Sequence, residues 1–121
     1  SEGLGVMTYS PLAVGLLSGV YSPDKPPPSD SLWGIRYQQG FTAAVDSVSG
    51  KVISSVNALA NELGKTPAQL ALAWILSHSE VTVAIAGGDT IEHLEDNIGA
   101  VGWTLDESVR EKLDAKYRCE Q

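Results

Sequence analysis

The chain has 121 residues, and its 43% hydrophobic and 19% charged residues are typical of a globular domain, which excludes disordered, collagen-like and coiled-coil chains. Fifteen acidic residues against eight basic ones give a net charge of −7, which argues against a surface for nucleic-acid phosphates. No apolar run approaches the roughly 20 residues that a membrane-spanning helix needs, and the single cysteine, Cys119, excludes an internal disulfide. We therefore expect a cytoplasmic protein with one domain, residues 1–121, that binds neither nucleic acid nor membranes.

The first predicted element is a strand over residues 5–9, where a short apolar run stands between a glycine and a Ser-Pro pair. Such a run predicts a buried strand that stops at the proline. The next segment, 11–19, is apolar but contains two glycines, which favours a tight buried loop or a single helical turn.

Residues 22–42 are predicted to be a proline-rich loop. The four prolines between residues 23 and 28 exclude a helix or a central strand there, so this segment should be exposed and extended. Loops of this length are often lids or binding loops, and a solvated linker is an equally good interpretation.

Two helices are predicted in the middle of the chain. Valine and leucine recur at three- and four-residue steps over 45–63, which predicts an amphipathic helix that ends before Gly64. A second helix is predicted over 66–78. Thr66 and Gln69 can form its capping box, and Pro67 suits the first helical position. Its apolar surface is so broad that we expect it to pack on more than one side.

The last part of the chain predicts a second strand and two more helices. The β-branched run 81–86 is typical of a buried parallel strand. A helix is predicted over 89–101, with a possible capping box at Asp89-Thr90-Ile91-Glu92 and one apolar face made by Ile91, Leu94, Ile98 and Val101. Another helix is predicted from residue 104 to about 113, with Leu105, Val109 and Leu113 facing inward. Strands that alternate with helices indicate an α/β fold with a parallel sheet. Two strands cannot form a stable sheet alone, so further strands are missing or copies of the chain complete one another.

Few residues carry a signal for a functional site. A strand followed by Gly87-Gly88 and a capped helix places backbone N–H groups where they attract phosphates, although glycines after a strand are more often only a turn. Tyr9 is a candidate platform for stacking a flat ring, or an ordinary core tyrosine. His78 and His93 lack metal-ligand partners at suitable spacing, so no metal site is expected.

Three motifs, taken in chain order, resemble the aldo-keto reductases, and most closely the branch that includes potassium-channel beta subunits. GLGVMTYSPLAVGLLSGVY (3–21) resembles the seventh strand and its loop, TPAQLALAW (66–74) the helix before the eighth strand, and IAGGDTIEHLEDNIGAV (85–101) the eighth strand and the cofactor-binding helix. This resemblance implies a partial (β/α)₈ TIM barrel, made of the last two strand–helix units with flanking helices and completed by missing sequence or by oligomerisation.

The resemblance also implies a function, because this family reduces aldehydes and ketones with NADPH. The chain would be the cofactor-binding C-terminal portion of an NAD(P)H-dependent oxidoreductase, with Tyr9 stacked on the nicotinamide. Ser10, Pro11, Leu12, Ala13 and Val14 would line the pyrophosphate path. The adenosine end would lie near Gly87, Gly88, Asp89, His93, Asp96 and Asn97.

This sequence departs from the family pattern in two ways. Nothing in it matches the motifs of the family's catalytic Asp, Tyr, Lys and His, so we assign no catalytic residue and expect no activity from the chain alone. Val20, Asp30 and Asp89 stand where the family often has a lysine, an arginine, and a serine or arginine that meets the 2′-phosphate.

These substitutions bear on the choice of cofactor. A carboxylate about 4 Å from a phosphate repels it by roughly 1 kcal/mol even at the dielectric constant of water. We therefore predict weak binding of NADPH, with NADH tolerated relatively better, unless Lys25 or Arg36 compensates. The alternatives to an enzyme part are a noncatalytic nucleotide-binding module and a structural protein that buries its open sheet edges in a homo-oligomer.

Overall fold

The computed structural model describes residues 2–45 and 48–117. In chain order its elements are β1 (Met7–Tyr9), α1 (Leu32–Ile35), α2 (Gln38–Val45), α3 (Val48–Glu62), α4 (Pro67–Leu76), β2 (Val83–Ile85), α5 (Ile91–Ile98) and α6 (Glu107–Tyr117). The two strands pair in parallel, with Met7 opposite Val83 and Tyr9 opposite Ile85. The predicted α/β class and the parallel pairing are confirmed.

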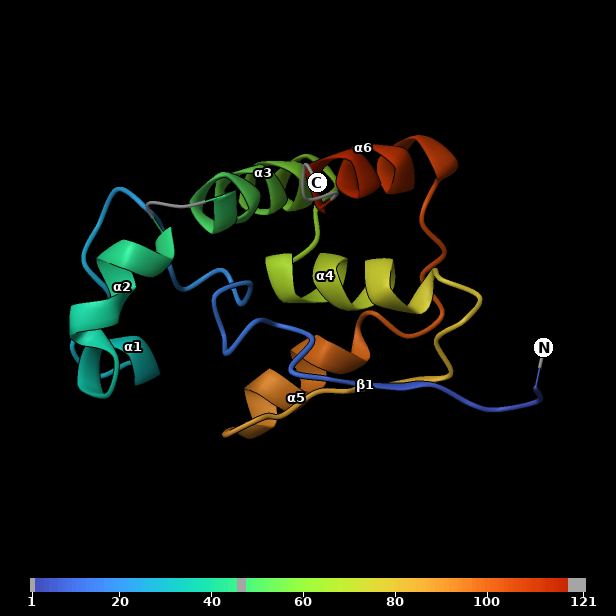
Figure 1. Cartoon of the computed structure of the whole chain (residues 1–121), viewed down its shortest axis with the longest axis horizontal. Coiled ribbons are helices and arrows are strands. Elements are labelled where there is room, and N and C mark those ends of the chain that lie inside the picture. The colour runs from blue at the N-terminus through green and yellow to red at the C-terminus, as the bar shows by residue number, and fades with distance from the viewer. Residues whose placement is uncertain (1, 46–47, 118–121) are drawn as a thin grey trace.

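Helix α4 is the centre of the fold. The strands lie on one side of it, and α3 and α6 form a layer on the other side (Figure 1). Five of its residues are buried, namely Ala68, Leu70, Ala71, Leu72 and Ala73. The prediction that this helix packs on more than one side is therefore confirmed.

The hydrophobic core lies among α2, α3, α4, α6 and the loop after β1, and not within the sheet. Its most deeply buried large side chains are Ile53, Val56 and Leu70. Val109 and Leu113 of α6 are 7% and 2% exposed, so α6 closes the core as the apolar spacing predicts. Among the described residues, no helix combines the length and apolarity that would let it cross a lipid bilayer.

Side-chain hydrogen bonds determine where helices α4 and α5 begin. Before α4, the Thr66 hydroxyl accepts a hydrogen bond from the Gln69 backbone N–H at 3.1 Å, and the Gln69 side chain accepts one from the Thr66 N–H at 3.2 Å. This confirms the predicted capping box. At α5 the cap is Thr90 rather than Asp89, because the Thr90 hydroxyl accepts the His93 N–H at 3.2 Å.

The prediction of one loop over 22–42 is wrong beyond residue 31, where α1 and α2 begin. Ser31 starts α1, since its hydroxyl accepts from the Gly34 N–H at 3.2 Å and donates to the Pro28 carbonyl at 2.6 Å. The buried Phe41 then fixes α2 against the core. The predicted helix over 45–63 also needs correction, because Val45 ends α2 and α3 begins only at Val48.

The prediction that both strands are buried is wrong on one face of the sheet. Met7 is 68% exposed, Val83 44% and Ile85 51%, whereas Thr8 and Ala84 are half-buried on the face towards α4. The cause is that α4 covers only one side of the strands, and no described element covers the other. Apolar side chains on this face of the strands are therefore left uncovered by the described residues.

Candidate functional site

The predicted site residues gather at one edge of the sheet. In a parallel pair the carboxyl ends of the strands lie at the same edge, which is where α/β folds bind ligands. Tyr9 and Ile85 are the last residues of β1 and β2 and lie opposite each other. The loop after Tyr9 and the loop that contains Gly87 therefore leave the sheet side by side, at the end of β1 away from the N label (Figure 1).

Tyr9 presents its ring to solvent at this edge. Its side chain is 83% exposed and lies on the uncovered face of the sheet, together with Met7. The core-tyrosine interpretation is therefore wrong for Tyr9, and it fits Tyr21, which is 5% exposed. An exposed aromatic ring beside a strand terminus can stack on a flat ligand ring.

The loop after β1 has a strained backbone. Ser10, Ala13 and Val14 have φ angles of +50°, +51° and +57°, which non-glycine residues rarely adopt. Each such residue costs about 1–2 kcal/mol relative to the right-handed conformation. Strain of this kind persists only where the surroundings enforce it, and it concentrates at functional sites.

Backbone hydrogen bonds and buried side chains stabilise this strained loop. The Ala13 N–H donates to the Ser10 carbonyl at 3.0 Å, and the Leu17 N–H donates to the Leu12 carbonyl at 3.1 Å. Leu16 and Leu17 are each 8% exposed and belong to the core. The prediction of a tight buried loop is thus confirmed only at Leu16 and Leu17, while residues 13, 14 and 19 are exposed.

The second loop lies against the first turns of α5. A Cβ atom at Gly88 would lie 2.7 Å from Leu94 Cδ2, so a larger residue there would force Leu94 to move. At Gly87 a Cβ atom would meet nothing within 4 Å, and the Gly87 carbonyl accepts a hydrogen bond from the Asn97 side chain at 3.1 Å. Gly88 therefore serves helix packing, and Gly87 leaves open space at the sheet edge.

Two carboxylates stand at the start of α5. Asp89 is exposed and immediately precedes the cap residue Thr90. The pKa of Glu92 is lowered below its ordinary value of 4.5, chiefly by a hydrogen bond from its own backbone N–H, then by the Thr90 hydroxyl and by the nearby His93. Two carboxylates at the start of a helix weaken the attraction of its N-terminus for a further anion.

Asp96 and Asn97 have structural partners that the sequence does not reveal. Asp96 Oδ2 accepts the Thr66 hydroxyl at 2.9 Å, and its backbone carbonyl accepts the Gln69 side-chain amide at 3.0 Å. Asp96 thus joins α5 to the start of α4, while Asn97 holds the Gly87 loop. His93 is exposed on α5. The contact of these three side chains with an adenine ring stays a prediction.

An apolar groove of about 320 Å³ lies beside the second loop, between α4, β2 and α5. Its apolar walls include Leu72, Leu76, Ala84, Leu94, Ile98 and Val101. Ile98 and Val101 are 66% and 72% exposed, although the spacing predicts one apolar helix face there. This groove lies on the α4 side of the sheet, where Ala84 points, and is a second apolar surface that the described residues leave open, besides the uncovered sheet face.

The described residues hold no group of three or more His, Cys, Asp or Glu side chains that could share a metal ion. Cys119, which the sequence makes a poor nucleophile candidate, lies outside the described residues.

Trp33 is a residue that the sequence does not single out, because it lies in the segment predicted as a loop. Its indole N–H donates to the Val14 carbonyl at 3.0 Å.

Comparison with known proteins gives consistent matches. The sequence model of the aldo/keto reductase family matches residues 1–118 of this chain. A probable voltage-gated potassium channel subunit beta from Arabidopsis thaliana is 38% identical over 103 residues, which are 84% of this chain and 31% of that protein. A probable aldo-keto reductase 1 from Glycine max is 35% identical over 114 residues, which are 93% of this chain and 32% of that protein.

A third relative is a chloroplastic pyridoxal reductase from Arabidopsis thaliana, 30% identical over 119 residues, which are 98% of this chain and 30% of that protein. Among solved structures, a glycerol dehydrogenase from Gluconobacter oxydans matches with a TM-score of 0.70 at 23% identity, over 93% of this chain and 33% of that one. At this identity the structural match shows the fold alone. The chain spans about a third of the length of these proteins.

Proposed function

Because the chain belongs to the aldo/keto reductase family, we propose that it is the cofactor-binding portion of an NAD(P)H-dependent oxidoreductase. One observation carries this proposal: the exposed ring of Tyr9 and the strained loop 10–14 stand beside the Gly87 loop at the carboxyl edge of a parallel strand pair. A flat ring, a path of backbone groups and a second loop in this order suit the three parts of a dinucleotide.

In this proposal Tyr9 holds one face of the nicotinamide ring by stacking. The bound cofactor supplies the hydride that reduces a carbonyl. Residues 10–14 line the pyrophosphate, and the loop from Gly87 to Asp89 approaches the adenosine. No side chain of this chain is assigned as proton donor to the carbonyl, since the family's catalytic motifs do not occur in this sequence.

The acidic start of α5 supports a preference for NADH over NADPH. The family resemblance puts Asp89 near the additional 2′-phosphate of NADPH, and Glu92, whose pKa is lowered, adds a second negative charge three residues further on. NADH lacks this phosphate and avoids the repulsion.

The uncovered surfaces support a role within a larger assembly. We propose that further polypeptide of the same barrel covers the face of β1 and β2 and the groove beside α5, since the chain spans about a third of its relatives. A cytoplasmic location belongs to this proposal and rests on the single cysteine in the sequence.

In the alternative of an oligomerising structural module, a second copy of the chain covers the open sheet face and the groove beside α5. That alternative requires a defined oligomer by light scattering together with no binding of nucleotide.

The direct test of the proposal is a titration of the purified chain with NADH, followed by quenching of protein fluorescence. We expect saturable binding by the wild type, retained binding by Tyr9→Phe, and weakening of about five- to tenfold by Tyr9→Ala, because loss of an aromatic stack costs about 1 kcal/mol or more. Equal affinities of all three proteins would contradict the role of Tyr9, and the absence of binding by all three would contradict the proposed function.

A further inference from the structure

Trp33 links the segment after the prolines to the strained loop after β1. Its indole N–H donates to the Val14 carbonyl at 3.0 Å, across a separation of 19 residues in the chain. In the described part of the chain no other donor to this carbonyl is seen. Val14 is also one of the three non-glycine residues with a positive φ angle in this loop. The bond therefore acts directly on the strained part of the backbone.

The indole itself is held by aromatic neighbours. The ring centroid of Trp33 lies 5.1 Å from that of Tyr37 and 6.0 Å from that of Phe41, in tilted and edge-on arrangements that aromatic pairs favour. Phe41 is 3% exposed, and its ring lies 5.8 Å from the buried Tyr21. Through this cluster Trp33 is fixed to the hydrophobic core.

The backbone that carries Trp33 is also fixed. Ser31 caps α1 through its bond with the Gly34 N–H, and it ties α1 back to the proline segment through its bond with the Pro28 carbonyl. The indole therefore approaches Val14 from an anchored helix. The strained loop is held on one side by the buried Leu16 and Leu17 and on the other side by Trp33.

We propose that Trp33 is a positioning residue for cofactor binding. It keeps Ala13 and Val14 in the left-handed conformation in which loop 10–14 passes along the pyrophosphate, and it touches no part of the cofactor itself. This proposal rests on the proposed function in cofactor binding. It makes the segment 22–45 part of the site, whereas the alternative interpretation of the sequence is a solvated linker.

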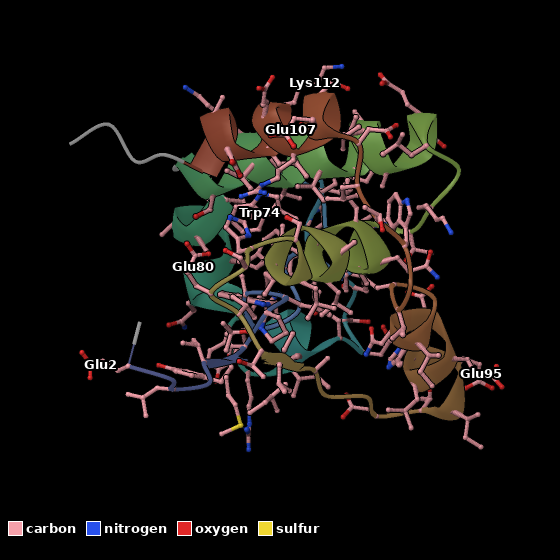
Figure 2. The ribbon with its side chains drawn as sticks, turned by 90° about the vertical axis from the view of Figure 1, so that its right-hand side faces the viewer. Glu2, Trp74, Glu80, Glu95, Glu107 and Lys112 are labelled. Atoms are coloured by element: carbon pink, nitrogen blue, oxygen red, sulfur yellow. The ribbon has the colours of Figure 1, made fainter. Side chains whose placement is uncertain are left out.

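The test compares two tryptophan variants. Trp33→Phe keeps an aromatic ring in the cluster but removes the donor to Val14. Trp74→Phe is the matched control, because the Trp74 indole N–H donates to Asp114 Oδ1 at 2.7 Å, in the contact between α4 and α6 where Figure 2 labels Trp74. Both variants thus lose an indole hydrogen bond, but only the first loss lies at the strained loop.

Two readouts are needed, and circular dichroism first confirms that both variants are folded. In Trp33→Phe we expect the carbon-13 chemical shifts of Ala13 and Val14 to leave the left-handed pattern, and the Kd for NADH to rise about two- to tenfold, the range for one lost hydrogen bond. In Trp74→Phe we expect a lower melting temperature, with both readouts at wild-type values.

The outcomes separate the two proposals. Three results would each overturn the role of Trp33 and leave the proposed function standing. The first is that Ala13 and Val14 keep left-handed chemical shifts in Trp33→Phe. The others are an unchanged Kd for NADH in that variant, or an equal rise of the Kd in Trp74→Phe. If the wild-type chain binds no NADH, the proposed function fails and the positioning role fails with it. In that case, chemical shifts of Val14 that change in Trp33→Phe but not in Trp74→Phe would still show that Trp33 stabilises the backbone conformation of Val14.

Discussion

Asp89 and Glu92 make the proposed adenosine end of the candidate site acidic. Asp89 belongs to the loop before α5 and Glu92 to the first turn of that helix, and the pKa of Glu92 is lowered from its ordinary value. A third negative group must compete with both. The choice between NADH and NADPH can therefore be tested at single residues.

Asp89→Ser should raise the affinity for NADPH relative to NADH by about fivefold, because it removes a repulsion of roughly 1 kcal/mol from the 2′-phosphate. Glu95→Gln is the control, since it changes the net charge equally and Glu95 points outward from α5 (Figure 2). Calorimetric titration of each variant with both dinucleotides measures the ratio. An unchanged ratio in Asp89→Ser, or an equal change in the control, would contradict this role.

Glu92 should contribute to stability in a way that depends on pH. Because its pKa in the folded chain is lowered from the ordinary value of 4.5, its contribution is fully present above that value and is lost as the pH falls through the lower, folded pKa. Glu92→Gln should therefore lower the melting temperature at pH 7 and have little effect near pH 3. Thermal melts at several pH values check this, and a difference that grows on acidification would show the opposite sign.

The contact between α4 and α5 depends on a few polar atoms. Thr66 caps α4 and also donates to Asp96 of α5, so one hydroxyl serves two helices. Gly99, just after α5, adds to this contact because its missing Cβ leaves room for the Gln69 side chain. The position of the Gly87 loop depends on α5, through Asn97. This contact therefore fixes one of the two loops of the site.

Thr66→Ala should lower the free energy of unfolding by about 1–2 kcal/mol, since the variant loses a helix cap and leaves a half-buried carboxylate oxygen without its partner. Thr66→Ser keeps the hydroxyl and should be close to the wild type. Urea unfolding of the three proteins measures the difference. If the serine variant is as unstable as the alanine variant, the hydroxyl is not the stabilising group.

At the scale of elements, the sequence predicts what local chemistry determines. The cap at Thr66, the stop before Gly64, whose φ angle is +65°, and the inward face of α6 follow from residue type and spacing alone. Helix α1 cannot be predicted in this way, because prolines precede it and its fixation depends on the distant partners Phe41 and Val14. The strained backbone after Tyr9 also leaves no trace in composition, since Ala13 and Val14 are ordinary apolar residues.

At the scale of the whole molecule, the open surfaces are the main feature. The core is built by helices, while the sheet face and the groove beside α5 expose apolar side chains such as Ile85 and Ile98. The sequence already indicates that two parallel strands are too few. It also predicts candidate site residues through family motifs, whereas the contacts of Asp96, Asn97 and Trp33 within the fold come only from the tertiary structure.

The most direct measurement is an NMR titration of the isotope-labelled chain with NADH. We expect chemical-shift changes confined to residues 9–15 and 87–97, at the carboxyl edge of β1 and β2 and along α5, with α3 and α6 unaffected. The absence of saturable changes, or changes centred on the opposite side of the molecule, would contradict the assignment of this edge as the cofactor site.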